Sequence, residues 1–113
     1  ANADIYVLGD ASQQGDMPKS GFSANSQAKV CANAVRGSLT GSKVFPAKFS
    51  NTCWSLVHEN DGIKVGATYK ATAEKIAKVD GFISATNESA ELRKATYEES
   101  EGWYAGITAD MFG

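Results

Sequence analysis

The sequence predicts an α+β fold, in which a strand and a helix are followed by a small three-stranded antiparallel sheet and a C-terminal helix. Three observations lead to this prediction. A short apolar run at residues 4–8 precedes a helical pattern, as in half of a βαβ unit. An Asp-Gly pair at residues 61–62 separates two strand-like runs, which is typical of a hairpin. From residue 90 the composition favours a helix again.

The first two elements are predicted from the run Asp4–Leu8 and from the residues that follow it. Five residues that end at Gly9-Asp10 suit a strand buried on both faces, and a lone strand and helix would not bury both. Helical spacing then extends over Phe22–Leu39, where Ser20 or Ser23 is the expected cap. The expected apolar stripe of this helix is Ala24, Ala28, Cys31, Val35 and Leu39. We therefore interpret Cys31 as a core residue.

The remaining elements follow a connecting arm that contains Pro46. We expect one piece over residues 1–41 and a second over residues 42–113. Strands are predicted at residues 51–58, 63–70 and 74–84, with Ile63, Val65, Ala67 and Tyr69 on one face of the second strand. A helix is predicted over residues 90–111, and its expected apolar stripe is Leu92, Ala95, Tyr104, Ile107 and Met111.

Composition excludes several classes of function. With 113 residues and a formal net charge of −2, the chain has no basic stripe that would indicate a nucleic-acid partner. No apolar run reaches the roughly 20 residues that span a bilayer, so no membrane insertion is expected. Two cysteines and one histidine do not complete a zinc site, so no metal is expected. Acidic residues concentrate after residue 87, where the sequence has six acidic residues and two basic ones.

Five segments together resemble the flavoprotein subunit of flavocytochrome c sulfide dehydrogenase. They are VLGDA at residues 7–11, MPKSGFSANSQAKV at 17–30, NTCWS at 51–55, and EGWY at 101–104 with DMFG at 110–113. The resemblance extends over the whole chain, and between residues 57 and 90 it rests on the strand pattern. It implies that the first strand and helix belong to a dinucleotide-binding domain, and that residues 42–113 form a flavin-covering interface domain.

The resemblance also implies FAD as the cofactor and assigns roles to individual residues. Asp10 would bind the ribityl chain, with Gly9 and Ala11 against the cofactor. The flavin ring would lie beside Lys19, Ser20 and Gly21, where the positive end of a helix stabilises negative charge on a reduced flavin. Trp103 would pack near the flavin, and Cys53 would be one half of a redox-active cysteine pair.

The activity that the resemblance implies is sulfide oxidation. Sulfide would attack the cysteine disulfide, two electrons would reach FAD, and a c-type cytochrome would accept them, in the periplasm. The partner cysteine and the Gly-x-Gly-x-x-Gly segment that holds a dinucleotide pyrophosphate are both missing from these residues. We therefore expect a C-terminal piece of a longer protein that is inactive by itself.

Two alternatives remain open. A related sulfide:quinone oxidoreductase would need a membrane-associating C-terminal end, which the acidic residues there disfavour. Residues 42–113 could instead be a non-catalytic module for docking or dimerisation, and apolar surface around them predicts that the isolated chain self-associates.

Overall fold

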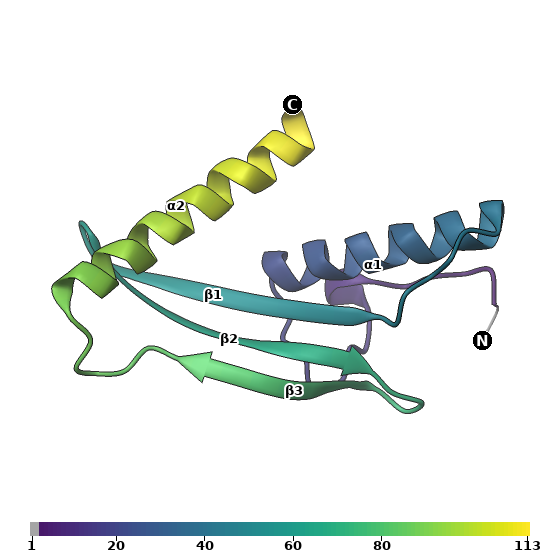
Figure 1. Cartoon of the computed structure of the whole chain (residues 1–113), viewed down its shortest axis with the longest axis horizontal. Coiled ribbons are helices and arrows are strands. Elements are labelled where there is room, and N and C mark those ends of the chain that lie inside the picture. The colour runs from purple at the N-terminus through teal and green to yellow at the C-terminus, as the bar shows by residue number, and fades with distance from the viewer. Residues whose placement is uncertain (1–2) are drawn as a thin grey trace. The chain divides into compact units, whose positions relative to one another are not determined.

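The computed structural model describes residues 3–113 and shows two helices, a 3₁₀ turn and a three-stranded antiparallel sheet (Figure 1). The α+β class predicted from the sequence is confirmed. The sheet has the strand order β1-β2-β3. In chain order, the elements are η1 (Gly9–Ala11), α1 (Gly21–Thr40), β1 (Lys48–His58), β2 (Asp61–Ala71), β3 (Ile76–Ile83) and α2 (Ala90–Phe112).

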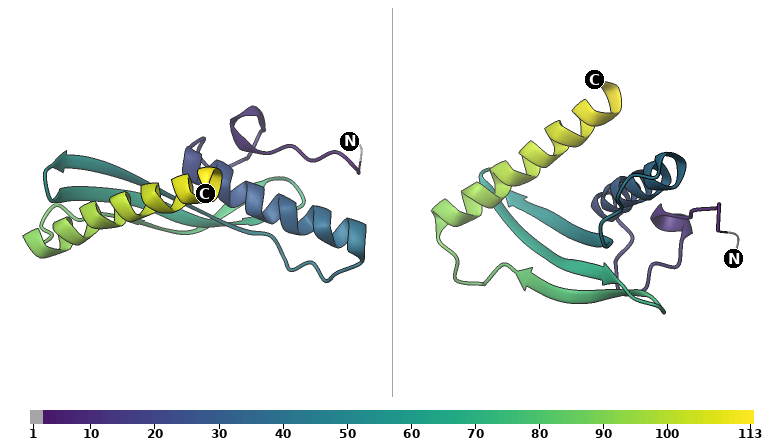
Figure 2. Two further views of the ribbon diagram at one scale, coloured as in Figure 1. Left: turned by 90° about the horizontal axis from the view of Figure 1, so that it is seen from above. Right: turned by 45° about the vertical axis from the view of Figure 1, so that its right-hand side comes forward.

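The chain divides into two compact units. The first unit consists of Ala1–Thr52 and Gly66–Gly81, and the second of Cys53–Val65 and Phe82–Gly113. Each strand thus contributes residues to both units. Figure 2 shows α1 in the first unit and α2 in the second from two further directions.

Helix α1 extends one residue beyond the predicted limits at each end, and it buries a different face from the predicted one. Ser20 caps its N-terminus by accepting a hydrogen bond from the Ser23 amide, and Gly41 ends it in the left-handed conformation. The buried positions are Ser23, Gln27 and Gly37, whereas Leu39 from the predicted apolar stripe is 80% exposed. The prediction is wrong about the face because the two polar side chains on the buried face have hydrogen-bond partners, which removes the cost of burying them.

The core of the first unit is small. It consists of Met17 from the loop before α1 and Ala67 and Tyr69 of β2, with partly buried Phe49 and Ile76 against them. The predicted inward face of β2 is thus confirmed at Ala67 and Tyr69. Val65 was predicted to share this face, but it is 48% exposed.

The turn of the β1–β2 hairpin lies two residues before the Asp-Gly pair that predicted it. Glu59 and Asn60 form the turn, and Asn60 has a φ of 58°, while Asp61 and Gly62 already belong to β2. Gly62 has another role, since a Cβ there would lie 3.0 Å from the backbone nitrogen of Tyr97. The glycine therefore lets α2 lie close against β2 within the second unit.

Helix α2 begins at its Ser89 cap, close to the predicted position, but packs through a mainly polar face. Thr96 is its buried residue, whereas Leu92, Tyr104 and Met111 of the predicted stripe are 48%, 68% and 65% exposed. An ion pair between Arg93 and Asp61 ties the helix to β2. The apolar spacing missed this face because ion pairs and a tryptophan contact, rather than aliphatic side chains, form it.

The strand predicted at Asp4–Leu8 is not formed in this structure. Ile5–Leu8 has no regular secondary structure, and its side chains are exposed. A strand needs a neighbour for its backbone hydrogen bonds, and the sheet of residues 3–113 contains only β1, β2 and β3. Within the same residues, no helix combines the length and the apolar character that crossing a membrane requires.

Candidate functional site

The loop between residues 9 and 21 contains six of the predicted cofactor-binding residues and is shaped by Gly9. Gly9 is buried and has a φ of 75°, a left-handed conformation that favours glycine. Its amide donates a 2.7 Å hydrogen bond to Oε1 of Gln27 in α1. The 3₁₀ turn at Gly9–Ala11 is therefore held against α1 by an uncharged hydrogen bond between a backbone amide and a side chain.

A network of buried amide side chains supports this turn. Gln14 and Gln27 are 6% and 5% exposed, and Nε2 of Gln27 donates to Oε1 of Gln14 at 2.8 Å. Ser12 donates to the carbonyl oxygen of Gly9 at 2.7 Å, and Gln14 donates to that of Pro18 at 2.7 Å. Because buried amides are costly to leave unpaired, this chain of bonds defines the path of the loop.

Asp10, Lys19, Ser20 and Gly21 come together where the loop enters α1. The Lys19 ammonium donates to the backbone carbonyl of Asp10 at 2.6 Å, which joins the two ends of the loop. Ser20 caps the helix and Gly21 is its first residue. The Asp10 side chain is exposed, as is Ala11 beside it. This region thus combines an ammonium group and a helix N-terminus, both positive, with one accessible carboxylate.

Asn51 of β1 holds the start of α1 in place. Its Oδ1 accepts hydrogen bonds from the hydroxyls of Ser20, at 2.6 Å, and Ser23, at 3.0 Å. Ser23 is fully buried and Asn51 is 4% exposed, so these bonds lie in a dry environment. Asn51 therefore determines where the predicted flavin-facing residues lie on the first unit.

The same loop is also tied to β3 through Asp16. Its carboxylate forms an ion pair with Lys75 at 2.6 Å and accepts the Lys78 amide hydrogen at 3.1 Å. The hydrogen bond from Lys75, followed by that from the Lys78 backbone, lowers the pKa of Asp16 below its ordinary value of 3.8. Gly15 has to be a glycine here, because its φ is 67° and a Cβ would lie 2.6 Å from the Ile76 carbonyl oxygen.

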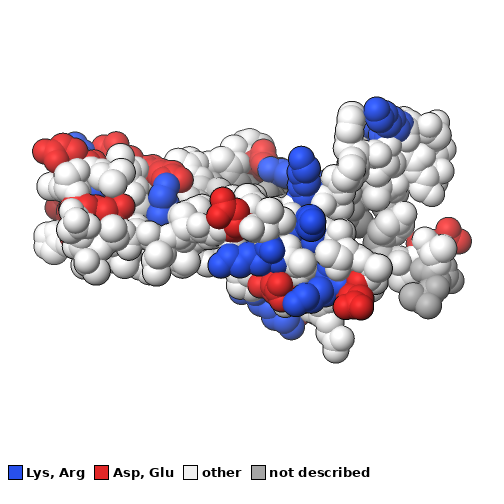
Figure 3. Space-filling model, turned by 60° about the horizontal axis from the view of Figure 1, so that its bottom comes forward, with Lys and Arg blue, Asp and Glu red and all other residues white. Residues whose placement is uncertain are grey.

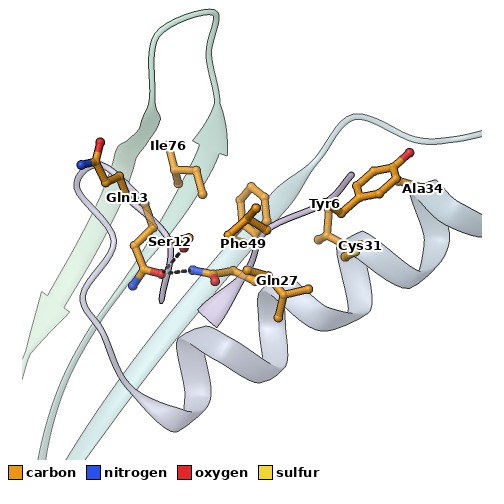
Figure 4. Close-up of a pocket in the computed structure, with 12 residues that line it drawn as sticks. Tyr6, Ser12, Gln13, Gln27, Cys31, Ala34, Phe49 and Ile76 are labelled. Carbon is orange, nitrogen blue, oxygen red and sulfur yellow. Dashed lines mark hydrogen bonds between the residues drawn. The ribbon is translucent and has the colours of Figure 1, made fainter. Parts of the chain in front are cut away.

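A pocket of about 280 Å³ lies in the first unit beside the amide network (Figure 4). Cys31, predicted to be core, is half-buried and contributes to its wall. None of the predicted cofactor-binding residues lines this pocket. The lining residues are Tyr6, Val7, Leu8, Ser12, Gln13, Gln14, Gln27, Val30, Cys31, Ala34, Phe49 and Ile76.

Cys53 and Trp103, the other two predicted site residues, belong to the second unit. Trp103 of α2 contacts Trp54 of β1, with ring centroids 5.8 Å apart and planes at 33°. Cys53 directly precedes Trp54 on β1. Cys53 is half-buried, and both it and Cys31 are thiols rather than disulfide sulfurs.

Sequence reasoning missed the polar residues that support the loop. Gln14, Gln27 and Asn51 are distant in sequence and become partners only in the fold. One signal was available, since Ser23 and Gln27 are four residues apart and hence share one helix face. Two polar residues on one face of a helix indicate either that the face is exposed to solvent or that it is buried in a hydrogen-bond network. Their spacing does not distinguish these two cases.

The chain matches a known protein family. The family described as "Flavocytochrome c sulphide dehydrogenase, flavin-binding" matches residues 46–112, which is more than half of the chain. The matched range contains all three strands, α2, Asn51, Cys53 and Trp103.

Proposed function

Because the chain belongs to the family of flavocytochrome c sulphide dehydrogenase flavin-binding domains, we propose that it forms the C-terminal part of a sulfide-oxidising flavoprotein subunit. The family assignment makes the domain a flavin-binding one from an oxidoreductase. The observation that carries the proposal is the position of Cys53 within the matched range, on a strand that also carries Asn51. The finer roles below extend this assignment to individual residues.

The entry to α1 has the chemistry that a flavin with its ribityl chain requires. The exposed carboxylate of Asp10 is an acceptor for hydroxyl groups, buried Gly9 shapes the turn, and Ala11 is exposed beside Asp10, where a ligand can approach. The Lys19 ammonium and the N-terminus of α1, at Ser20 and Gly21, favour negative charge nearby. When bound, the flavin supplies the capacity to take two electrons and release them singly. These residues would hold and orient it.

Cys53 is the proposed reactive residue. A hydrosulfide ion attacks one sulfur of a disulfide between Cys53 and a second cysteine outside residues 1–113. A new S–S bond forms a persulfide on the attacked sulfur, the original S–S bond breaks, and the other sulfur leaves as a thiolate. The half-buried position of Cys53 on β1 holds the thiol in a defined place and leaves it partly accessible.

The partners and location follow from the same proposal. A c-type cytochrome is the proposed electron acceptor of the whole protein, and the periplasm is its proposed location. The chain alone would not turn over sulfide, because the second cysteine and the dinucleotide-binding glycine motif are outside it.

The test is sulfide-dependent reduction of cytochrome c by the complete flavocytochrome that contains this chain. We expect Cys53→Ser to abolish the reduction while the flavin stays bound, because a serine cannot form the disulfide. Cys31→Ser is the matched control and should retain the activity. Unchanged cytochrome reduction by Cys53→Ser would refute the proposed role of this residue.

A further inference from the structure

A second pocket of the first unit, about 500 Å³ in volume, lies on the strands and apart from the loop described above. Its lining comes from all three strands. The residues are Lys48, Phe49 and Ser50 of β1, Thr68, Tyr69 and Lys70 of β2, and Val79 of β3. We call this the strand groove. Its volume lies in the range of about 300–1,000 Å³ that is usual for small-molecule sites.

Two lysines in the strand groove have no acidic neighbour in its lining. Lys48 and Lys70 come from adjacent strands, and none of the ion pairs found within residues 3–113 involves either of them. By contrast, Lys75 in the same unit pairs with Asp16. Two ammonium groups that line one pocket without a carboxylate partner favour an anion beside them, because hydrogen bonds between ionised groups are among the strong ones. On the face seen in Figure 3, several Lys and Arg side chains lie near one another, with Asp and Glu side chains among them.

The rest of the strand groove is largely apolar and well supported. Tyr69 is 6% exposed and packs in the core with Phe49 against it, so this part of the lining is held in place from below. Val79 is 59% exposed and offers an aliphatic surface to a ligand. Ser50 and Thr68 add hydroxyl groups beside the lysines. An apolar surface next to two ammonium groups matches a molecule with an apolar body and an anionic end.

We propose that the strand groove binds an organic anion, with its carboxylate, sulfonate or phosphate group between Lys48 and Lys70 and its apolar body along Phe49 and Val79. The two lysines supply charge-assisted hydrogen bonds. The apolar part distinguishes such a ligand from a small inorganic anion, which would leave Phe49 and Val79 uncovered. The proposal does not depend on the flavin or on sulfide oxidation.

The experiment is an NMR titration of the full 113-residue chain with three probes. They are 1-naphthoate, the cation 1-naphthylmethylammonium, which has the same ring system, and inorganic phosphate. We expect 1-naphthoate to shift the amide signals of Ser50 and Thr68 in a saturable way, and the cation not to do so. Phosphate should bind there more weakly than 1-naphthoate, since it covers no apolar surface.

Variants then test the two lysines. Lys48→Gln with Lys70→Gln should raise the dissociation constant of 1-naphthoate about tenfold or more, because two charge-assisted contacts are lost. The double variant Lys43→Gln with Lys78→Gln removes the same charge from residues of the first unit that do not line the strand groove. It should leave the dissociation constant of 1-naphthoate nearly unchanged. Equal effects of the two double variants, equal binding of the cation, or phosphate binding as tight as that of 1-naphthoate would each overturn the proposal.

Discussion

The side-chain oxygen of Asn51 in β1 accepts a hydrogen bond from the hydroxyl of Ser23 in α1, and the Ser23 side chain is fully buried. This bond joins two residues 28 positions apart. The bond therefore links β1, which contains Cys53, to α1, whose first residues are proposed to face the flavin.

Replacing Asn51 tests how much this link contributes. Asn51→Ala removes the acceptor of both Ser20 and Ser23 and leaves a buried hydroxyl without that acceptor. We expect the free energy of unfolding to fall by about 2–3 kcal/mol, measured by urea denaturation. Asn87→Ala, at an exposed position, should change it by less than about 0.5 kcal/mol. A loss at Asn51 no larger than this control would contradict the structural role.

Gly15 and Gly102 should respond to alanine in opposite directions. At Gly15 the φ of 67° and the Ile76 carbonyl, 2.6 Å from a Cβ, predict a loss of about 2–4 kcal/mol for Gly15→Ala. Gly102 lies inside α2 with open space around its Cβ position, so Gly102→Ala should gain about 0.5–1 kcal/mol. Thermal unfolding of both variants checks the prediction, and a stable Gly15→Ala protein would refute the described loop contact.

Asp16 should make the stability depend on pH. Its hydrogen bonds with Lys75 and the Lys78 backbone lower its pKa below 3.8 in the folded chain. The carboxylate therefore stabilises the fold above the unfolded-state pKa, and this contribution is lost as the pH falls through the lower, folded-state pKa. Asp16→Asn should melt at a lower temperature than the wild type at pH 7, and the two melting temperatures should begin to converge below about pH 4 and meet only below the folded-state pKa.

The control for this experiment is Asp110→Asn, since Asp110 is exposed near the end of α2. Its melting temperature should follow that of the wild type across the same pH range. A difference between Asp16→Asn and the wild type that persists unchanged in acid would show that the charge of Asp16 is not the cause.

The contact between Trp54 and Trp103 should be measurable as a coupling energy. In a double-mutant cycle, the variant with both Trp54→Leu and Trp103→Leu should lose about 0.5–1.5 kcal/mol less than the sum of the two single losses, because each single variant already loses the contact between rings 5.8 Å apart. Tyr104 is 68% exposed on the same helix, so the cycle of Trp54→Leu with Tyr104→Leu should give no coupling. Coupling of equal size in both cycles would argue against a specific ring contact.

The segment Ile5–Leu8 should drive self-association of the isolated chain. Ile5 and Val7 are 67% and 68% exposed, and the segment has no strand partner among the described residues. In analytical ultracentrifugation we expect dimers or larger species, and Val7→Lys should shift them towards the monomer. Leu39→Lys, at another exposed apolar side chain, should have a smaller effect. A wild-type chain that sediments as a clean monomer would refute this prediction.

Local patterns predicted the elements well and their buried faces poorly. The limits of α1 and α2 follow from Ser20, Gly41 and Ser89, whose effects act within a turn of helix. The buried faces depend on partners elsewhere in the chain. Trp103 of α2 packs against Trp54 of β1. The apolar spacing instead predicted that Tyr104 and Met111 are buried, and both are exposed.

The candidate site shows the same division. Lys19, Ser20 and Gly21 were predicted as a group from one continuous motif, and the structure places them with Asp10 at the entry to α1. Gln27 and Asn51, which hold this region, were not predicted. A polar residue is buried only where another part of the chain satisfies its hydrogen bonds, and no local spacing shows that.

The sequence by itself determined the α+β class, the approximate positions of α1, α2 and the three strands of the sheet, and the family resemblance, because periodicity, caps and motifs are properties of neighbouring residues. Only the tertiary structure decided which faces are buried, that Asp16 is tied to Lys75, and that Lys48 and Lys70 line one groove. These are distances between residues far apart in the chain, and they are set by packing and hydrogen bonding rather than by order along the sequence.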